Sequence, residues 1–505
     1  IYMLASCFAM LSRHRDIGIS DFALSQKGAG KFDTSCLHGL VFDNNVSDHT
    51  FTPDDERLFL LDLYNATGGP YYWYKKTGWN STTHHCQWYG VRCYENSSYI
   101  KWIDLRNNGL TGRLPNFWKI RNLQGICLQV NRKMVGELSS VISGNMTRLR
   151  RLCVSYSGLS GKIPWDIILQ LHNLEKLQIC CTDGKLYGII SPYVDRLSKL
   201  QVFSLAENNI RSDLPMSIRN LKKIWFFDIE YVELISGKLW YFSNMSQLQY
   251  LHLTNCGIGG TIPNDFGKTL PNMVELHLRG NNLQGEIKNC FDGFQSITQI
   301  RLGSNKFHGQ LPASLSNLET LQELDLSSNN FADVAANFSF NSRLQILYLN
   351  DNVQLRVDGN RLLKALQPCI YTLRLLVANN CGLKGELLNS LFNFREVLYI
   401  NLSNNNLTGR LPTDESFTMV YLFYLNFASN NFSGRIPMRF FSPLKSLTYF
   451  DARQNPLLKS NTLSPKMNVT YGVTMKRDTL SCPTLRLAYS GGRLEIDPSY
   501  YDYSL

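Results

Sequence analysis

The stretch "IKWIDLRNNGLTGRLP", residues Ile100–Pro115, returns along most of this 505-residue chain. Variants of it begin at Leu149 (LRRLCVSYSGLSGKIP), Leu248 (LQYLHLTNCGIGGTIP) and Val397 (VLYINLSNNNLTGRLP). They share the rule LxxLxLxxNxLxGxIP and a step of 23 to 29 residues. A fixed period in this range predicts a solenoid, because each unit is too small to bury its own apolar face and packs on its neighbours. The segments, about fifteen in all, start at Ile100, Leu123, Leu149, Leu174, Leu200, Ile224, Leu248, Met273, Ile297, Leu321, Leu344, Leu373, Val397, Leu422 and Leu447.

The residue pattern of one repeat has a physical reason. Its LxL piece predicts a short strand, in which alternate side chains point to opposite faces, so Ile103 and Leu105 face the core and Asp104 and Arg106 face out. The Asn that follows carries donors and acceptors, and it can therefore satisfy backbone groups that the next turn would leave unpaired. The residues in this slot are Asn108, Asn208, Asn281, Asn305, Asn329, Asn405 and Asn430, with Cys256 and Cys381 taking it as small buried residues.

These repeats resemble the plant-type leucine-rich repeats of extracellular proteins, such as receptor-like-protein ectodomains. The resemblance implies an α/β solenoid, a superhelix with parallel strands on its concave face and short 3₁₀ helices and loops on its convex side. It also implies a second short strand at "LTGxIP", where Gly suits a tight bend and Pro closes it.

A different pattern, from Phe51 to Tyr99, precedes the repeats. Thr52 and Pro53 are placed as the N-cap and first residue of a helix, and a double Gly, two tryptophans and "CQWYGVRC" follow. This order resembles the N-terminal cap of plant-type leucine-rich repeats, and that resemblance implies a disulfide between Cys86 and Cys93. We therefore divide the chain into an N-terminal extension of unclear fold (1–50), a cap (51–99), the repeats (100–468) and a non-repeating C-terminal segment (469–505). Within the long repeat at 344–372, "NRLLKALQ" predicts a helical turn on the convex side.

The chain has thirteen cysteines, so at least one is unpaired or bonded to another molecule. Cys127 and Cys153 fall in the same strand column of adjacent repeats, which is close enough either for a disulfide or for two reduced thiols. The sequence leaves open the pairing of Cys7, Cys36, Cys127, Cys153, Cys180, Cys181, Cys290, Cys369 and Cys482.

Eleven N-x-S/T sequons predict a secreted or cell-surface glycoprotein that carries N-linked glycans. No cofactor is predicted. No run of 18 or more apolar residues predicts a membrane span within this chain, although the sequence cannot tell whether an anchor follows Leu505. The net charge of +11 is scattered along the chain, and no nucleic-acid motif accompanies it. The sequons are Asn45, Asn65, Asn80, Asn96, Asn145, Asn244, Asn337, Asn401, Asn406, Asn431 and Asn468.

Neither a catalytic nor a cofactor site is predicted. The best cluster is a strip of outward residues on neighbouring strands, in which His252 and His277 could bind a metal. A polar strip on an exposed sheet is the simpler interpretation, because the third ligand is not fixed, and we predict no metal site. The other members of this strip are Asp228, Glu275 and Arg301.

Outward aromatic residues mark a candidate binding face. Tyr399, Tyr424 and Tyr449 take one slot in three successive repeats, and Trp102, Phe226 and Tyr250 take the same slot earlier. Aromatic side chains with a polar tip are favoured contacts for proteins and for sugars, but tyrosine is also a good strand residue. The sequon at Asn401 would place a glycan beside Tyr399.

The favoured function is a non-enzymatic, extracellular recognition scaffold whose concave or lateral face binds a protein, peptide or glycan. The alternative is a structural subunit that self-associates into an extracellular coat or filament. The surplus cysteine, the sequons and a tyrosine-rich tail at Tyr500, Tyr501 and Tyr503 fit that alternative equally well.

Overall fold

The computed structural model describes residues 51–459 apart from 183–184, 336–338, 387–388, 412–418, 437 and 442, together with two short strands at 473–474 and 486–487. These residues belong to one unit, Phe51–Leu505. The N-terminal extension, Cys7, Cys36, Cys482, the terminal tyrosines and the sequons at Asn45, Asn337 and Asn468 lie outside the described residues.

The N-terminal cap begins with helix α2 (Pro53–Ala66). The Thr52 hydroxyl accepts the Asp55 N–H at 3.3 Å, and the Asp55 carboxylate accepts the Thr52 N–H at 2.8 Å, so both residues satisfy free donors of the first turn. Behind the helix, Trp73, Trp79 and Trp88 are packed with ring centroids 4.8 and 5.1 Å apart. The cap also contains α3 (Gly69–Tyr72), the 3₁₀ helix η1 (His85–Gln87) and β1 (Val91–Cys93).

A disulfide joins Cys86 to Cys93, with the two Cα atoms 5.5 Å apart. This confirms the pairing that the resemblance implied. Because β1 pairs antiparallel with β2 (Ile100–Asp104), the bond ties the cap to the edge of the first repeat. The cap thus covers a layer of apolar side chains that the first repeat would otherwise expose.

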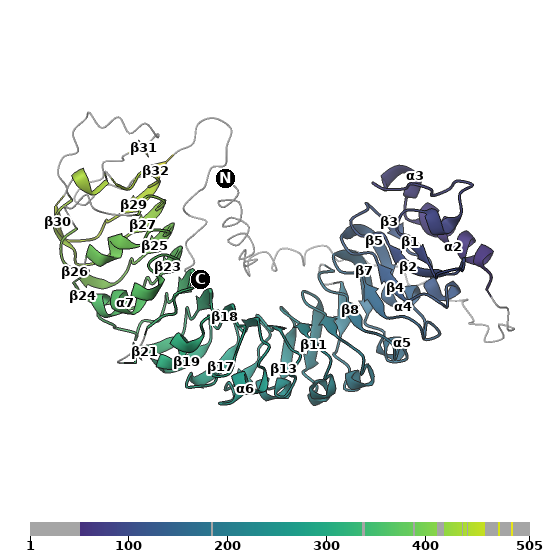
Figure 1. Cartoon of the computed structure of the whole chain (residues 1–505), viewed down its shortest axis with the longest axis horizontal. Helices are drawn as coiled ribbons and strands as arrows, with labels where there is room; N and C mark the ends of the chain where they lie inside the picture. The colour runs from purple at the N-terminus through teal and green to yellow at the C-terminus, as the bar shows by residue number, and fades with distance from the viewer. Residues whose placement is uncertain are drawn as a thin grey trace, which may run out of the picture. The chain divides into compact units, whose positions relative to one another are not determined.

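From β2 onward, one sheet runs through the whole repeat region, and every further pairing in it is parallel (Figure 1). Each expected repeat start is followed by one strand of this long sheet. Its remaining strands are β4 (Gly125–Cys127), β6 (Arg151–Cys153), β8 (Lys176–Gln178), β10 (Val202–Ser204), β12 (Phe226–Asp228), β14 (Tyr250–His252), β16 (Glu275–His277), β18 (Gln299–Arg301), β20 (Glu323–Asp325), β22 (Ile346–Tyr348), β23 (Leu375–Val377), β25 (Tyr399–Asn401), β27 (Tyr424–Asn426) and β29 (Tyr449–Asp451).

The second strand implied by the plant-type resemblance is also present. It forms parallel sheets beside the long one, and their strands again follow sequence order. The six-stranded sheet contains β3 (Thr111–Arg113), β5 (Asn131–Glu137), β7 (Ser157–Lys162), β9 (Leu186–Gly188), β11 (Asn209–Asp213) and β13 (Glu233–Ser236). The four-stranded sheet contains β15 (Gly259–Gly260), β17 (Asn282–Glu286), β19 (Lys306–Leu311) and β21 (Asn330–Val334), and two pairs follow, β24 (Lys384–Glu386) with β26 (Asn406–Thr408) and β28 (Ser433–Arg435) with β30 (Leu457–Lys459).

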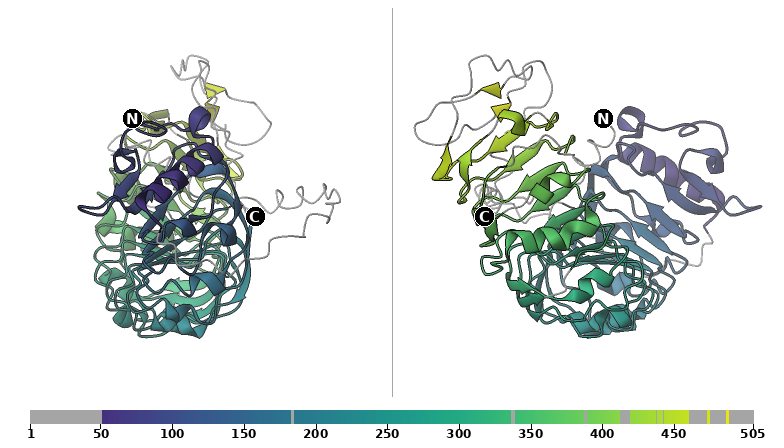
Figure 2. Two further views of the ribbon diagram at one scale, coloured as in Figure 1. Left: turned by 90° about the vertical axis from the view of Figure 1, so that its right-hand side faces the viewer. Right: turned by 60° about the vertical axis from the view of Figure 1, so that its left-hand side comes forward.

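Short helices complete the repeats on the side opposite the long sheet (Figure 2). The expected helical turn is α7 (Gly359–Leu366), capped by the Asp358 carboxylate, and it lies between β21 and β24, where the series of second strands is interrupted. The others are η2 (Phe117–Lys119), α4 (Leu138–Val141), α5 (Trp165–Ile168), η3 (Val194–Arg196), η4 (Met216–Asn220), η5 (Leu239–Phe242), α6 (Phe266–Thr269), η6 (Ala313–Asn317), η7 (Gln367–Cys369), η8 (Asn389–Asn393) and η9 (Met438–Phe441), and the two C-terminal strands are β31 (Val473–Thr474) and β32 (Arg486–Leu487).

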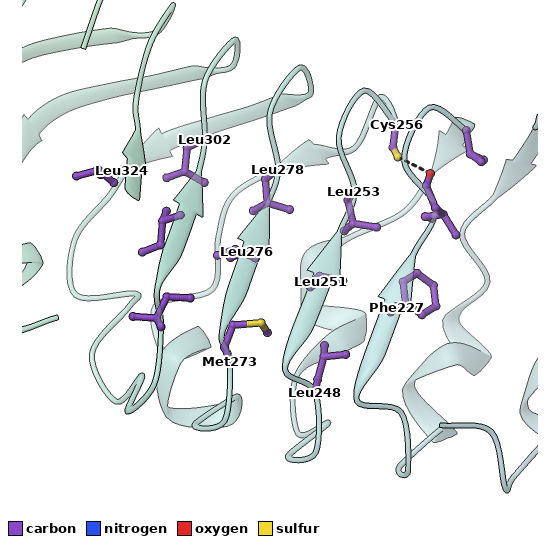
Figure 3. Packing of buried hydrophobic residues seen from close by; sticks show 14 of the residues in the cluster. Phe227, Leu248, Leu251, Leu253, Cys256, Met273, Leu276, Leu278, Leu302 and Leu324 are labelled. Atoms are coloured by element: carbon purple, nitrogen blue, oxygen red, sulfur yellow. Dashed lines mark hydrogen bonds between the residues drawn. The ribbon is translucent and has the colours of Figure 1, made fainter. Parts of the chain in front are cut away.

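The core is built from the three apolar positions of the LxxLxL pattern. Leu248, Leu251 and Leu253 are fully buried, and each stacks on the equivalent residue of the next repeat (Figure 3). Removing one such side chain typically costs about 2–5 kcal/mol. The leucine period therefore gives the energetic reason for the solenoid.

The Asn slot links each repeat to the one before it. The Asn281 side chain donates to the carbonyl oxygens of Leu253 and Leu278 at 2.7 and 2.9 Å and accepts N–H groups of Cys256 and Ile258 at 3.1 and 3.0 Å. We call this set of side chains the asparagine ladder. Cys256 and Cys381 take the slot as buried thiols, as predicted, and donate to the carbonyl oxygens of Ile229 and Leu349. Three further residues, Asn131, Asn352 and Asn455, have the same bonding pattern and were not among the predicted members.

Candidate functional site

The outward face of the long sheet carries the candidate binding residues. In the strands from β2 to β29, the residue before and the residue after the central buried position point outward, and the parallel register places equivalents opposite each other. Thus Phe226 pairs with Tyr250, and His252 pairs with His277. Neighbouring parallel strands lie about 4.8 Å apart, so flat side chains in one column are brought to stacking distance.

Tyr399, Tyr424 and Tyr449 form such a stack, here called the tyrosine stack. The ring centroids are 4.1 and 4.3 Å apart, and the planes differ by only 6° and 3°. Burial raises the pKa of all three hydroxyls, that of Tyr399 well above its ordinary value. Because each ring covers its neighbour's face, a partner can contact only the ring edges and their hydroxyl groups. The faces between the rings are not open to stacking by a sugar.

The three earlier aromatic residues of the predicted face lie in two other places. Trp102 extends over Gly125 of the next strand, where a Cβ would come within 1.8 Å of the indole, and the Arg151 guanidinium lies 5.0 Å from its ring centre. Phe226 and Tyr250 lie 5.8 Å apart, and Trp225 packs on the edges of both at 5.9 Å. Trp225 remains 38% exposed. Trp225, Phe226 and Tyr250, called the aromatic patch below, thus form an open group.

Next to the aromatic patch lies a cluster of Glu230, His252, Glu275 and His277, called the histidine cluster. The two imidazoles stack with centroids 4.2 Å apart, and Glu275 Oε2 lies 3.0 Å from His252 Nε2. Glu230 was not singled out in the sequence, because it follows strand β12 in an outward column that had not been aligned with the histidines. Its carboxylate lies 3.7 Å from His277 Nδ1 and accepts the Thr254 hydroxyl.

Two residues of the predicted polar strip turn away from the histidines. Asp228 accepts the Ser204 hydroxyl at 2.8 Å, and burial raises its pKa to about 6, helped by the negative charge of Glu230. Arg301 forms two hydrogen bonds with Glu323 at 2.7 and 3.0 Å, which together raise the pKa of the guanidinium against the effect of burial. Within the strip, Arg301 is thus paired with Glu323 and Asp228 is bonded to Ser204. The remaining members, His252, Glu275 and His277, belong to the histidine cluster.

The predicted glycosylation sites differ in their exposure. Asn401 is half-buried at the end of β25, and its Oδ1 accepts the N–H and the hydroxyl of Ser403 at 3.1 and 2.7 Å. Asp325 makes the same two bonds with Ser327, so Asn401 takes part in a recurrent strand-end turn. The exposed sequon residues are Asn65, Asn80, Asn96, Asn145, Asn244, Asn406 and Asn431.

The cysteines that the sequence left open are separate thiols wherever they are described. Cys127 and Cys153 lie opposite each other on paired strands, and their thiols are hydrogen-bonded. Cys180 and Cys181 are consecutive, with their Sγ atoms 3.0 Å apart. Cys290 and Cys369 are buried, and burial raises the pKa of Cys290 to about 12.

Comparison with known families agrees with this architecture. Residues 53–94 match the leucine rich repeat N-terminal domain, and residues 246–307 match the leucine rich repeat. The fold is a leucine-rich-repeat solenoid. Among the described residues, no helix has the length and apolar character needed to cross a bilayer.

Curated proteins similar to this leucine-rich-repeat chain are plant receptor-like proteins. Receptor-like protein 6 of Arabidopsis thaliana is 29% identical over 221 residues, which is 43% of this chain and 20% of the relative. Receptor-like protein 9DC1 of Solanum pimpinellifolium is 25% identical over 277 residues, or 50% of this chain and 31% of the relative. Receptor-like protein Cf-9 of the same species is 27% identical over 272 residues, or 48% and 30%. The match thus spans less than a third of each relative.

Solved structures with the same fold include two receptor complexes. The plant peptide hormone receptor RGFR1 in complex with RGF2 superposes with a TM-score of 0.56 at 22% identity, over 74% of this chain and 71% of the receptor chain. PEPR1–AtPEP1 superposes with a TM-score of 0.57 at 22% identity, over 80% and 66%. At this identity the likeness shows the fold.

Proposed function

We propose that this chain is an extracellular, non-enzymatic recognition scaffold that binds a peptide or protein on the outward face of its long sheet. The aromatic patch carries the proposal. Trp and Tyr dominate binding energy at protein interfaces, and here Trp225, which is partly exposed, packs against Phe226 and Tyr250. The names of the plant relatives and the peptide complexes among the solved structures support the same function.

The adjoining charges favour a peptide over a sugar. Glu230 and Glu275 place carboxylates beside the aromatic patch, and the side chains remain 25% and 24% exposed. Such carboxylates attract a basic or amino-terminal group, whereas the indole and phenol accommodate an apolar side chain. In the tyrosine stack, by contrast, the stacked rings leave little open surface for a ligand.

Selection from a random peptide library on the secreted, glycosylated protein tests the proposal. Peptides that bind the wild-type protein should lose at least tenfold in affinity for the Trp225→Ala, Tyr250→Ala variant. Tyr193→Ala is the matched control, because Tyr193 is 59% exposed and precedes η3, away from the long sheet. Selected peptides that bind the double variant and the wild type equally would contradict the proposal.

Self-association into a coat or filament stays the alternative. Light scattering of the same glycosylated sample, across a range of concentrations, separates the two functions. A recognition scaffold gives one constant mass, whereas a coat subunit gives a mass that rises with concentration.

A further inference from the structure

We propose that Glu230, His252 and His277 form a binding site for a divalent transition-metal ion, with Zn²⁺ as the best chemical match. His252 and His277 end two neighbouring strands, β14 and β16, and are paired in register. One ligand atom from each of the three residues lies within 4.8 Å of the other two. The set combines two imidazoles with one carboxylate, which is a common zinc donor set.

The three ligand atoms need only a small inward movement. Zinc bonds of about 2.0–2.1 Å in a tetrahedral arrangement place ligand atoms roughly 3.3 Å apart. The Glu230 carboxylate and the two rings must therefore come closer together, which side-chain rotation allows while the strands stay in place. Glu230 Oε1 already lies 3.7 Å from His277 Nδ1. The two imidazole planes are 7° apart, so their nitrogen lone pairs point the same way, and the rings must rotate about their side-chain torsions to turn both lone pairs toward one ion.

Glu275 is a positioning residue for the histidines. Its Oε2 lies 3.0 Å from His252 Nε2 and can hold the Nε2–H tautomer of that ring, while Gln299 Oε1, 3.3 Å from His277 Nε2, can do the same for the second ring. The Nδ1 lone pairs are then left for the ion. A carboxylate behind a ligating histidine is the usual outer contact of zinc sites, since it fixes both the tautomer and the ring orientation. Thr254 fixes the third ligand in the same way, because its hydroxyl donates to Glu230.

The charges around the site favour a cation. Arg301 lies opposite His277 on the neighbouring strand, where its charge is paired with Glu323, and Arg279 is paired with Asp325. Glu230 and Glu275 place two carboxylates beside two imidazoles, and a divalent ion would balance their charge.

Imidazole nitrogens select among metals. Ca²⁺ and Mg²⁺ prefer all-oxygen sites, whereas Zn²⁺ and its neighbours in the transition series accept mixed imidazole and carboxylate ligands. Three protein ligands leave a fourth position for water or for a group of a bound ligand. Because Glu230 and His252 are part-exposed, with side-chain exposures of 25% and 14%, an ion can enter from solvent.

A second histidine group, in the cap, does not have these properties. His84, His85 and Cys86 lie close together, but the Cys86 sulfur is in the disulfide and cannot act as a thiolate ligand. The two histidines also make contacts of their own, His84 Nε2 with Ser98 Oγ at 3.1 Å and His85 Nε2 with the Ser98 carbonyl at 2.8 Å. They therefore serve as a control for adventitious binding.

Calorimetric titration of the chelator-treated, glycosylated chain with ZnCl₂ tests the site. We expect one Zn²⁺ per chain, and CaCl₂ should give no comparable heat. Substituting Co²⁺ gives an independent spectroscopic reading, because a tetrahedral nitrogen and oxygen site produces intense visible absorption. Glu275→Gln should weaken Zn²⁺ binding by about 10- to 100-fold and keep the 1:1 stoichiometry, as expected for a positioning residue.

Variants of the ligands decide the assignment. His252→Ala and Glu230→Gln avoid the more deeply buried His277, and each should abolish the Co²⁺ spectrum while the circular dichroism and the melting temperature stay near those of the wild type. The control variant His84→Ala, His308→Ala removes histidines outside the site and should bind Zn²⁺ as the wild type does. Loss of binding in that control, or full binding in His252→Ala, would overturn the proposal, as would a wild-type protein that binds no Zn²⁺.

Discussion

The histidine cluster and the tyrosine stack occupy the same sheet, and in both of them parallel register brings flat rings to 4.1–4.3 Å. The consequences differ because the rings differ. Phenols are neutral, so three of them can cover one another's faces and present an edge with few unpaired polar groups. Imidazoles carry ring nitrogens that require partners, and here those partners are carboxylates. The same backbone geometry therefore produces a surface of mutually covered rings in the tyrosine stack and a surface with ionisable groups in the histidine cluster.

Removing the middle ring of the tyrosine stack should have the largest effect. Tyr424→Ala deletes packing on both Tyr399 and Tyr449, and we expect the free energy of unfolding of this region to fall by about 2–3 kcal/mol, somewhat below the range for a fully buried aromatic residue. Hydrogen exchange of β25, β27 and β29 measures it, with β14–β18 as the internal reference. Tyr424→Phe keeps the stack and loses the hydrogen bonds of the hydroxyl with Asn426, Tyr399 and Tyr449, so it should cost less than Tyr424→Ala, about 1 kcal/mol. Equal effects of the two substitutions would refute the role of stacking.

Between pH 7 and 5, acid should weaken the histidine cluster by a smaller amount. The pKa of His277 is lowered in the folded state by burial, so its contribution is complete above the unfolded value of about 6.5 and is lost as the pH falls below it. The lowered pKa of Glu230 adds a further loss as the pH falls from about 4.5 towards 2. Asp228 acts in the opposite sense, since its raised pKa favours the folded state most below about 3.8 and that benefit is lost by about pH 6. Protection factors of β14 and β16 should fall between pH 7 and 5 in an Asp228→Asn background.

The tyrosine stack should respond at the other end of the pH scale. Burial raises the pKa of Tyr399 and Tyr424, so their contribution is complete below pH 10 and is lost only as the pH rises through the folded-state values. A spectrophotometric titration should show tyrosines that ionise only when β25–β29 unfold. If β25 and β27 lost as much protection as β14 and β16 between pH 7 and 5, the contrast between the two regions would fail.

The smallest effect is expected beside the stack, at Asn401. Its Oδ1 already accepts two bonds from Ser403, so we expect peptide mapping after deglycosylation to find Asn401 unmodified and the exposed Asn406 and Asn431 occupied. Asn401→Ala should cost about 0.5–1 kcal/mol through loss of these bonds. Full occupancy of Asn401 would mean that a glycan covers the Tyr399 end of the stack, and bare Asn406 and Asn431 would count against secretion.

The repeat period was enough to predict most of the fold. Positions such as Leu251 and Leu276 recur at a fixed step, and each proved to be a buried strand residue. Cys256 was placed in the asparagine slot because the slot requires a small buried side chain, and it proved to be there. Asn131 was not predicted, although it follows Leu128 at the same distance at which Asn108 follows Leu105. The repeat pattern alone would therefore have been sufficient to place it in the slot.

The candidate site was harder to predict, because it depends on side-chain direction. Arg301 shares a column with His277, yet it turns to Glu323, where two hydrogen bonds are available. Glu230 joins the histidines from a different outward column, a contact that a one-column alignment cannot reveal. The rings of the tyrosine stack cover one another's faces because of their side-chain torsions, which the amino-acid sequence does not specify.

The asparagine ladder has a consequence for how such a chain can change length. Each amide, such as that of Asn281, bonds backbone groups of its own repeat and of the one before it, and reaches no further. Excising or duplicating one whole repeat would therefore recreate an equivalent junction, while a partial excision would strand several buried carbonyl oxygens. A gene that encodes such repeats can gain or lose them in complete units, and the distance between the aromatic patch and the tyrosine stack can be reset without redesigning either.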